Sequence, residues 1–231
     1  MNYISDHIPR NTPFNRRPGT LITNLNSITI HNNANPTSTA KNERGWLTNP
    51  INKRDASFHI AVDENDAVEV IPTGLDIFPN TGPLEVAHHS ANRIGNRESL
   101  SIEICELNFE KSMKNTVILV SKIMYLKNLQ PVDVDRFIKK HSDWTNTDCP
   151  RLMNDTIWIN FLNMIKEKLK ELLNPSLDTK WDPEKAGLIA LDFLVDDGII
   201  NSPDIWKDKM FKPVPTWLLF ELLKRVINDK K

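Results

Sequence analysis

The sequence predicts an α/β fold, in which helices flank a central mixed β-sheet and a small helical domain follows at the C-terminal end. Three observations predict it. Short apolar runs such as SITI and SIEIC are typical of buried strands. Two later segments carry apolar residues at the spacing of an amphipathic helix. After Pro175 the pattern changes to short helical segments separated by turn residues. We therefore expect one domain at residues 1–174 and a second at residues 175–231.

The N-terminal half contains most of the predicted strands. The first twenty residues are rich in Pro, Asn and Arg and predict an extended arm. The run SITI predicts a short strand that ends at His31, and the polar sequence after it predicts a helix near 38–48. Residues 57–74 alternate apolar and polar side chains on both sides of the turn-like ENDA, which predicts a β-hairpin. Residues 100–107, LSIEICEL, predict a buried strand.

The later part of the chain is predicted to be helical. Residues 110–128 and 154–174 both show the amphipathic pattern, and Asn154 or Asp155 could cap the second helix, which Pro175 would stop. Two further helices are expected at about 182–197 and 215–228. The region after Pro175 holds three of the six tryptophans. These either anchor a small helical core or stack on sugars of a cell wall.

Composition and charge exclude several classes of protein. The 231 residues have a formal net charge of -1, whereas a general nucleic-acid binder needs a basic surface, so no nucleic-acid partner is expected. No apolar run approaches the roughly 20 residues that span a bilayer, so no membrane insertion is expected. No apolar signal segment is visible at the N-terminus. Two cysteines are too few for a disulfide framework, and Cys105 is expected to be a buried free thiol. These features fit synthesis in a reducing cytoplasm.

Two histidines and a cysteine form a candidate metal site. His31 follows the strand SITI, and His141 precedes the polar segment SDWTNTDC, which ends at Cys149. A catalytic zinc ion takes three protein ligands and keeps a fourth position for water, and two histidines with one cysteine are an acceptable set. The spacing between His141 and Cys149 is too long for one helix face, so a loop would have to fold back on the metal. The spacing alone also allows ordinary surface or core histidines.

Four motifs occur together and in order: ITIHNNAN, SFHIAVDENDAVEVIP, AHHSANRIGNRESLSIEIC and HSDWTNTDCPRL. Their combination resembles the zinc-dependent N-acetylmuramoyl-L-alanine amidases of type 2, which include phage endolysins and bacterial autolysins and share a fold with peptidoglycan recognition proteins. The opening NRRPGT is also similar to the NRPG entry of phage and Bacillus members. The resemblance covers roughly residues 5–170.

The resemblance implies a zinc cleft and assigns roles to particular residues. It makes His31, His141 and Cys149 the ligands of Zn²⁺. It makes Glu103 the group that takes a proton from the attacking water and passes it to the leaving alanine nitrogen. Ile102 and Ile104 point to the opposite face of the strand from Glu103. Glu103 on its own could equally be a strand carboxylate that faces solvent.

Four further positions follow from the resemblance. Many members have a lysine where this chain has Thr147, whose hydroxyl could donate a hydrogen bond to the substrate oxyanion. Phe58 replaces a tyrosine that assists catalysis in some relatives, and this leaves Glu103 as the main proton carrier. His89 in AHHSA is expected to contact substrate, with a surface loop histidine as the alternative. His59 is expected either to contact substrate or to be a structural histidine.

The resemblance implies an enzyme that cleaves the amide bond between N-acetylmuramic acid and L-alanine in bacterial peptidoglycan, most simply a phage endolysin. Such a protein would be made in the cytoplasm and would act at the cell wall after release. The alternative is a peptidoglycan-binding protein on the same scaffold that does not hydrolyse. Non-catalytic relatives usually lose a metal ligand, and Cys149 is present here. The C-terminal domain is expected to target the cell wall.

Overall fold

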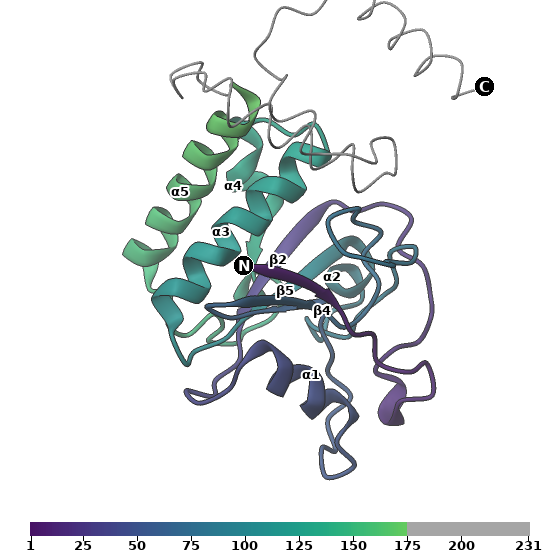
Figure 1. The fold of residues 1–231 in the computed structure, drawn as a ribbon. Helices are drawn as coiled ribbons and strands as arrows, with labels where there is room; N and C mark the ends of the chain where they lie inside the picture. Colours follow the sequence, from purple (N-terminus) through teal and green to yellow (C-terminus); the bar gives the residue numbers. More distant parts are fainter. Residues whose placement is uncertain (175–231) are drawn as a thin grey trace, which may run out of the picture. The chain divides into compact units, whose positions relative to one another are not determined.

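The computed structural model describes residues 1–174, which form a mixed sheet with helices on both faces (Figure 1). Six strands lie in the order β1-β4-β3-β5-β2-β6. Their bounds are β1 (Asn2–Ser5), β2 (Ser27–Asn32), β3 (Ile60–Val62), β4 (Asp66–Glu69), β5 (Ser99–Ile104) and β6 (Ile138–Lys140). The β3–β4 hairpin is antiparallel, and the other four neighbouring pairs are parallel. The predicted mixed sheet and the predicted hairpin are both confirmed.

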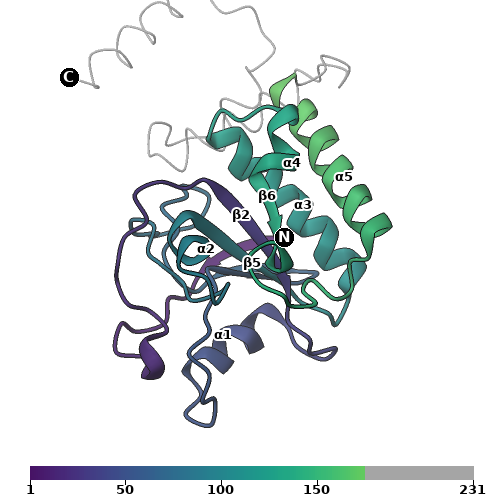
Figure 2. The same ribbon diagram turned by 180° about the vertical axis from the view of Figure 1, so that it is seen from behind.

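The helices form two layers on the sheet (Figures 1 and 2). Their bounds are α1 (Ala40–Thr48), α2 (Arg93–Glu98), α3 (Phe109–Leu126), α4 (Val134–Phe137) and α5 (Asp155–Leu173). The long helices α3 and α5 pack against each other and cover one face, where their apolar residues join those of the strands in the main core. Helix α1 lies on the opposite face and contributes Ala40 and Leu47 to a smaller core. The predicted helices at 38–48, 110–128 and 154–174 are thus present.

Alternation along the central strands separates a core face from a polar face. In β2, Ile28 and Ile30 are fully buried in the main core under α3 and α5. Because side chains of a strand alternate between faces, Thr29 and His31 point to the other side. In β5 the isoleucines are again in the main core, so Glu103 points to the same side as His31. The sequences SITIH and LSIEI therefore build one apolar layer and one polar layer from the same two strands.

Side-chain caps fix the starts of three helices. The Asn154 side chain accepts a hydrogen bond from the backbone N–H of Ile157 at 3.0 Å, so Asn154 and not Asp155 caps α5. Thr39 caps α1 in the same way, and Asn92 caps α2. Each cap satisfies a backbone donor that has no partner within its helix.

The N-terminal residues differ from the extended arm that the sequence predicts. Asn2–Ser5 form an edge strand that pairs in parallel with β4. The ring of Tyr3 packs edge-on against Phe78, with centroids 5.6 Å apart. Four residues without strong alternation give little strand signal, and the pairing depends on β4, more than sixty residues away in the chain. Strand β6 and helix α2 were not predicted either, because three and six residues are too few to show a period.

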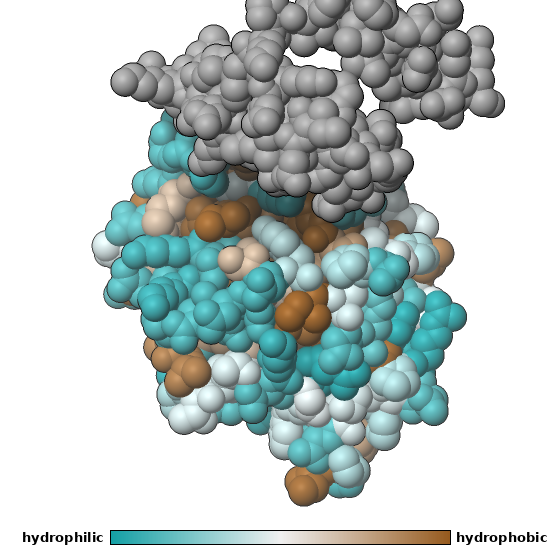
Figure 3. Space-filling model, in the orientation of Figure 1, coloured by the Kyte–Doolittle hydropathy of each residue, from teal (hydrophilic) through white to brown (hydrophobic). Residues whose placement is uncertain are grey.

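The face seen in Figure 3 is mostly hydrophilic, with separate hydrophobic patches between the polar residues. None of the helices within residues 1–174 has the length and apolar character that crossing a bilayer requires. The predicted helices at 182–197 and 215–228 and the three C-terminal tryptophans lie outside the described residues.

Candidate metal centre

Two neighbouring parallel strands bring His31 and Glu103 together. In the register of the sheet His31 of β2 lies directly beside Glu103 of β5. Paired residues of adjacent strands point to the same face, and the strands lie about 4.8 Å apart. His31 has only 5% of its surface exposed. The sheet alone therefore fixes a carboxylate next to a buried imidazole, although 72 positions separate the two residues in the chain.

The short strand β6 and the loop after it bring in the other two candidate ligands. Strand β6 pairs with β2 up to Lys140, so His141 emerges beside His31, and the centroids of the two imidazole rings are 4.6 Å apart. The backbone N–H of Ser142 donates to the carbonyl of Cys149 at 3.1 Å. This hydrogen bond closes the loop and returns Cys149 to the start of it. Asp143 accepts a hydrogen bond from the backbone of Lys140 at 2.9 Å, so it caps the turn.

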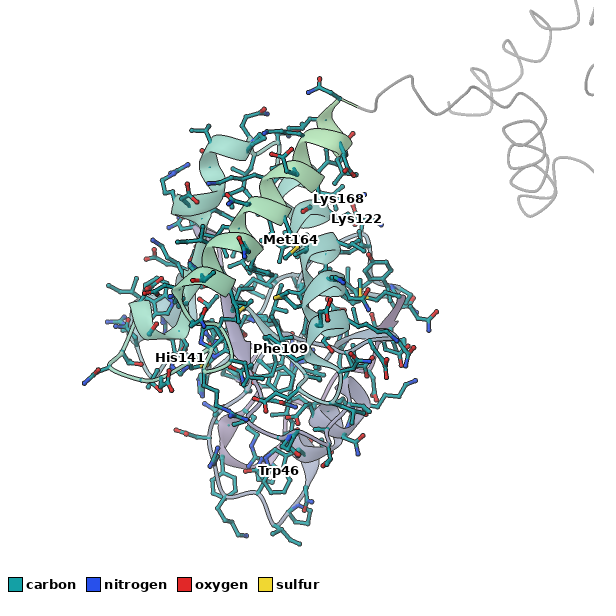
Figure 4. The ribbon with its side chains drawn as sticks, turned by 90° about the vertical axis from the view of Figure 1, so that its left-hand side faces the viewer. Trp46, Phe109, Lys122, His141, Met164 and Lys168 are labelled. Carbon is teal, nitrogen blue, oxygen red and sulfur yellow. The ribbon has the colours of Figure 1, made fainter. Side chains whose placement is uncertain are left out.

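Figure 4 places this loop in the molecule. His141 lies below α5, Met164 and Lys168 lie higher along that helix, and Trp46 of α1 lies at the lower end. A cleft of about 360 Å³ is lined by both His141 and Trp46. Its walls come from the end of β2, from α1, from residues 52–58, from Glu103 and from the loop that carries Cys149.

The three candidate ligands converge on one point. Donor atoms of His31, His141 and Cys149 all lie within 4.8 Å of one another. The distance from Nδ1 of His31 to Sγ of Cys149 is 3.7 Å. Two ligands of one tetrahedral zinc ion would be about 3.6 Å apart, given the usual bond lengths to nitrogen and sulfur. Nε2 of His141 is buried and has no hydrogen-bond partner among the described residues. A buried polar atom of this kind normally has a partner, and a metal ion would supply one.

The electrostatic environment fits the same interpretation. Burial, with the neighbouring histidines, lowers the pKa of His31 well below its ordinary value, and burial lowers the pKa of His141. Both rings are therefore neutral near pH 7, the form that binds metals. Burial, with the carboxylate of Glu103 nearby, raises the pKa of Cys149 to about 12. Such a thiol ionises near neutral pH only against a cation, and a metal ion deprotonates a coordinating thiol. The three residues could therefore hold a metal ion.

Glu103 is the carboxylate beside this cluster. It lines the cleft with the three candidate ligands. Burial, with repulsion from the carboxylates of Glu43 and Glu106, raises the pKa of Glu103 to about 8. A divalent cation nearby would lower this pKa again. A group whose pKa lies near the operating pH can both accept and return a proton.

A second carboxylate, that of Glu106, forms hydrogen bonds to both segments that carry candidate ligands. Glu106 is 8% exposed and accepts hydrogen bonds from the side chains of Asn32 and Arg151. It also accepts one from the backbone N–H of Ala34 at 2.9 Å. Asn32 follows His31, and Arg151 lies two residues after Cys149. Glu106 therefore connects the end of β2 to the loop that carries Cys149.

The NRRPGT motif anchors a wall of the cleft. The side chain of Arg16 is completely buried and donates to the backbone carbonyls of Leu47, Asn52 and Arg54 at 2.6–2.8 Å. The neighbouring Arg17 forms a bidentate pair with Glu85 at 2.8 and 3.0 Å. A guanidinium presents its donors in a rigid fork, so one arginine can fix three carbonyls of an irregular segment. The segment between α1 and β3 is thereby held against the cleft.

The remaining predicted residues occupy different positions. Thr147, Phe58 and Cys149 all line the cleft. His89 is 7% exposed, and its ring lies within 3.2 Å of Nε2 of His31. His59 has no exposed surface: its Nδ1 accepts from the backbone N–H of Ser101 at 3.0 Å, and its Nε2 lies 2.8 Å from the carbonyl oxygen of Glu85. The structural alternative for His59 therefore fits, and we do not propose substrate contact for it.

Sequence reasoning missed Glu106 and Arg151. Both lie close to residues that it selected, since Glu106 is three positions after Glu103 and Arg151 is two after Cys149. An acidic residue near Glu103 and a basic residue near Cys149 could have indicated an ion pair between the two segments. Nothing local to either residue indicates that they meet, because 45 positions separate them in the chain.

Comparisons with known proteins agree with this geometry. Residues 22–152 match the family model Amidase_2, described as N-acetylmuramoyl-L-alanine amidase. The chain is 32% identical to the N-acetylmuramoyl-L-alanine amidase CwlA of Bacillus subtilis over 63% of its own length and 50% of that protein. It is also 32% identical to the amidase XlyA of the same species, over 70% of this chain and 50% of that protein. The chain thus spans about half the length of the curated relatives that it matches.

The fold agrees as well. The structure of the catalytic domain of XlyA superimposes with a TM-score of 0.59 at 31% identity, covering 71% of this chain and 99% of that domain. The structure of PlyL gives a TM-score of 0.57 at 27% identity and covers 72% of this chain and 98% of that one. The sequence match, the shared fold and the convergence of His31, His141 and Cys149 beside Glu103 lead to one conclusion. The chain belongs to the N-acetylmuramoyl-L-alanine amidase family.

Proposed function

We propose that the chain is a zinc-dependent peptidoglycan hydrolase that cleaves the amide bond between N-acetylmuramic acid and L-alanine. The observation that carries the proposal is the meeting of two imidazoles, one thiol and one partly buried carboxylate in a single cleft. Membership of the amidase family and the relatives' printed activity support the choice of bond. Zinc is the metal that this set suits best, because two imidazoles and one thiolate leave a fourth tetrahedral position open.

The mechanism assigns one role to each group. His31, His141 and Cys149 hold the metal, which when bound supplies Lewis acidity for the scissile carbonyl and for water. Glu103 accepts the proton of the attacking water and returns it to the alanine nitrogen as the bond to the carbonyl carbon breaks. Thr147 donates a hydrogen bond toward the carbonyl oxygen, which is worth about 2.7–4 kcal/mol where water is excluded. Phe58 has no hydroxyl and contributes only an apolar wall, so Glu103 carries the proton transfer.

Analysis of the digestion products tests the proposed bond specificity. Purified full-length protein, loaded with zinc, is incubated with bacterial cell walls. We expect new N-terminal alanine to appear without new reducing sugar. Reducing sugar alone would indicate a glycosidase, and binding to the walls without either product would indicate a non-hydrolytic peptidoglycan-binding protein. Either of these results would overturn the proposal.

A structure of similar fold is an endolysin from Bacillus subtilis, with a TM-score of 0.59 at 28% identity. This relationship supports a role in which the protein reaches the cell wall from inside the cell at lysis. We propose that residues 1–174 carry the catalytic function and that residues 175–231, which lie outside the described residues, bind the cell wall. Tethering a catalyst to an insoluble polymer raises the effective concentration of its substrate.

Deletion of residues 176–231 tests the proposed targeting role. We expect the truncated protein to bind cell walls more weakly and to lyse them more slowly, while it hydrolyses a small soluble muramoyl-peptide at a nearly unchanged rate. Sedimentation with cell walls measures binding, and product analysis measures hydrolysis. An equal loss of both activities would assign these residues a structural role in place of targeting.

A further inference from the structure

A chain of hydrogen bonds runs from the candidate metal centre to helix α2. Nε2 of His31 lies 3.2 Å from Nδ1 of His89, and Nε2 of His89 lies 3.1 Å from the carbonyl oxygen of Gly95. We propose that His89 is a positioning residue, which fixes the tautomer and ring orientation of His31 so that Nδ1 of His31 is the metal-binding atom. This inference rests on the metal site of the proposed function. It adds the positioning role of His89 and names the nitrogen of His31 that binds the metal.

The Gly95 carbonyl, at the end of this series of hydrogen bonds, determines which nitrogen donates in each of them. A carbonyl oxygen only accepts hydrogen bonds, so Nε2 of His89 must carry the proton that Gly95 accepts. A neutral imidazole has a single N–H, which leaves Nδ1 of His89 as an acceptor. The proton between the two rings therefore belongs to Nε2 of His31. In neutral His31 the lone pair is then on Nδ1, the nitrogen that lies 3.7 Å from Sγ of Cys149.

Hydrogen bonds and close packing fix the backbone around His89 and Gly95. The side-chain carbonyl of Asn96 accepts hydrogen bonds from the backbone N–H groups of His89 and Ser90, both at 2.9 Å. Gly95 must lack a side chain here, because a Cβ atom would lie 2.9 Å from the Cβ of Ser90 and 3.0 Å from the Trp144 ring. The carbonyl of Gly95 can thus approach His89 closely. Metal-binding histidines generally donate their second N–H to a hydrogen-bond acceptor, which for His31 is Nδ1 of His89. Loss of such an acceptor typically lowers metal affinity about 10–100-fold.

This function differs from the substrate contact that the sequence suggested for His89. His89 is 7% exposed, and both of its ring nitrogens are already engaged within the protein. The neighbouring His88 is more exposed, and no hydrogen bond of its ring is found within residues 1–174. The two histidines of AHHSA therefore offer a matched control, since His89 contacts His31 and the preceding His88 does not.

The test compares three variants of the full-length chain by zinc affinity, measured in competition with a chelator. His89→Leu removes the acceptor, and we expect a loss of affinity of about 10–100-fold. His89→Asn places an amide oxygen near the position of Nδ1, and we expect it to restore most of the affinity. His88→Leu is expected to bind zinc as the wild type does. Nitrogen NMR of zinc-loaded wild type should show His31 protonated at Nε2.

The outcomes separate this inference from the proposed function. Wild-type protein that binds no zinc through Cys149, judged by the sulfur-to-metal absorption of its cobalt form, would overturn the metal site itself. Wild-type protein that binds zinc, with His89→Leu binding equally well, would overturn only the role of His89. Equal losses in the Leu and Asn variants, accompanied by equal falls in the melting temperature of the metal-free proteins, would show that His89 contributes packing alone.

Discussion

Replacing Glu103 with glutamine is expected to leave zinc bound and to lower kcat by about 10²–10⁴. Glutamine has nearly the same shape but cannot accept a proton from water or return one to the alanine nitrogen. Glu103 is not among the three residues whose donor atoms converge, so metal affinity should change little. The substitution also removes a carboxyl that lies near the carboxylates of Glu43 and Glu106, so the fold should not be weakened. Initial rates on a soluble muramoyl-peptide, with the zinc content of each sample, measure the effect.

A glutamate far from the cleft provides the control for this substitution. Glu167 lies on the exposed side of α5, and Lys170 is its ion-pair partner within residues 1–174. Glu167→Gln makes the same chemical change and should leave both kcat and zinc content as in the wild type. Undiminished hydrolysis by the Glu103→Gln variant would remove Glu103 from the mechanism. Loss of zinc from that variant would instead make Glu103 a part of the metal site.

The Cys149→Ser substitution is expected to lower zinc affinity by more than about 100-fold and to abolish hydrolysis. Substitution of a residue that only hydrogen-bonds to a metal ligand typically lowers metal affinity by about 10–100-fold. Loss of a ligand itself should exceed that range. A serine hydroxyl at this position does not ionise near neutral pH, so the site would lose its only negatively charged ligand. Competition with a chelator measures the affinity, and the melting temperature of the metal-free protein shows whether the fold persists.

The chain's other cysteine is the matched control. Cys105 is a free, fully buried thiol in the smaller core, and it is absent from the cluster of candidate ligands. Cys105→Ala should lower the melting temperature moderately, because it leaves a small cavity, but it should bind zinc and hydrolyse substrate as the wild type does. Equal zinc affinity in the wild type and the Cys149→Ser variant would exclude Cys149 as a ligand.

The sheet and the convergence of His31, His141 and Cys149 could be predicted from the sequence, because their signals are local or arranged in order. Alternation in SITIH and LSIEI indicates strands with one polar face, and parallel pairing then places His31 beside Glu103. Periodicity over many residues likewise indicates α3 and α5. The selection of His141 and Cys149 depended on the family resemblance, since their spacing alone is a weak signal.

Other features could not be predicted, because they arise only from contacts between distant segments. Strand β6 has three residues and is stabilised by its pairing with β2, yet it places His141. The link from Glu106 to Arg151 spans 45 positions. The role of His89 depends on which atom each ring presents, and a sequence motif does not contain that information. The same motif that marks His89 as important therefore leaves substrate contact and ligand support equally open.

Zinc K-edge X-ray absorption of the full-length protein, loaded with one equivalent of zinc, tests the central claim most directly. We expect one sulfur at about 2.3 Å and nitrogen ligands at about 2.0–2.1 Å in a four-coordinate shell, with the sulfur lost in Cys149→Ser. A shell that contains no sulfur, or a wild-type protein that does not retain one equivalent of zinc, would contradict the convergence of His31, His141 and Cys149 on a single metal ion.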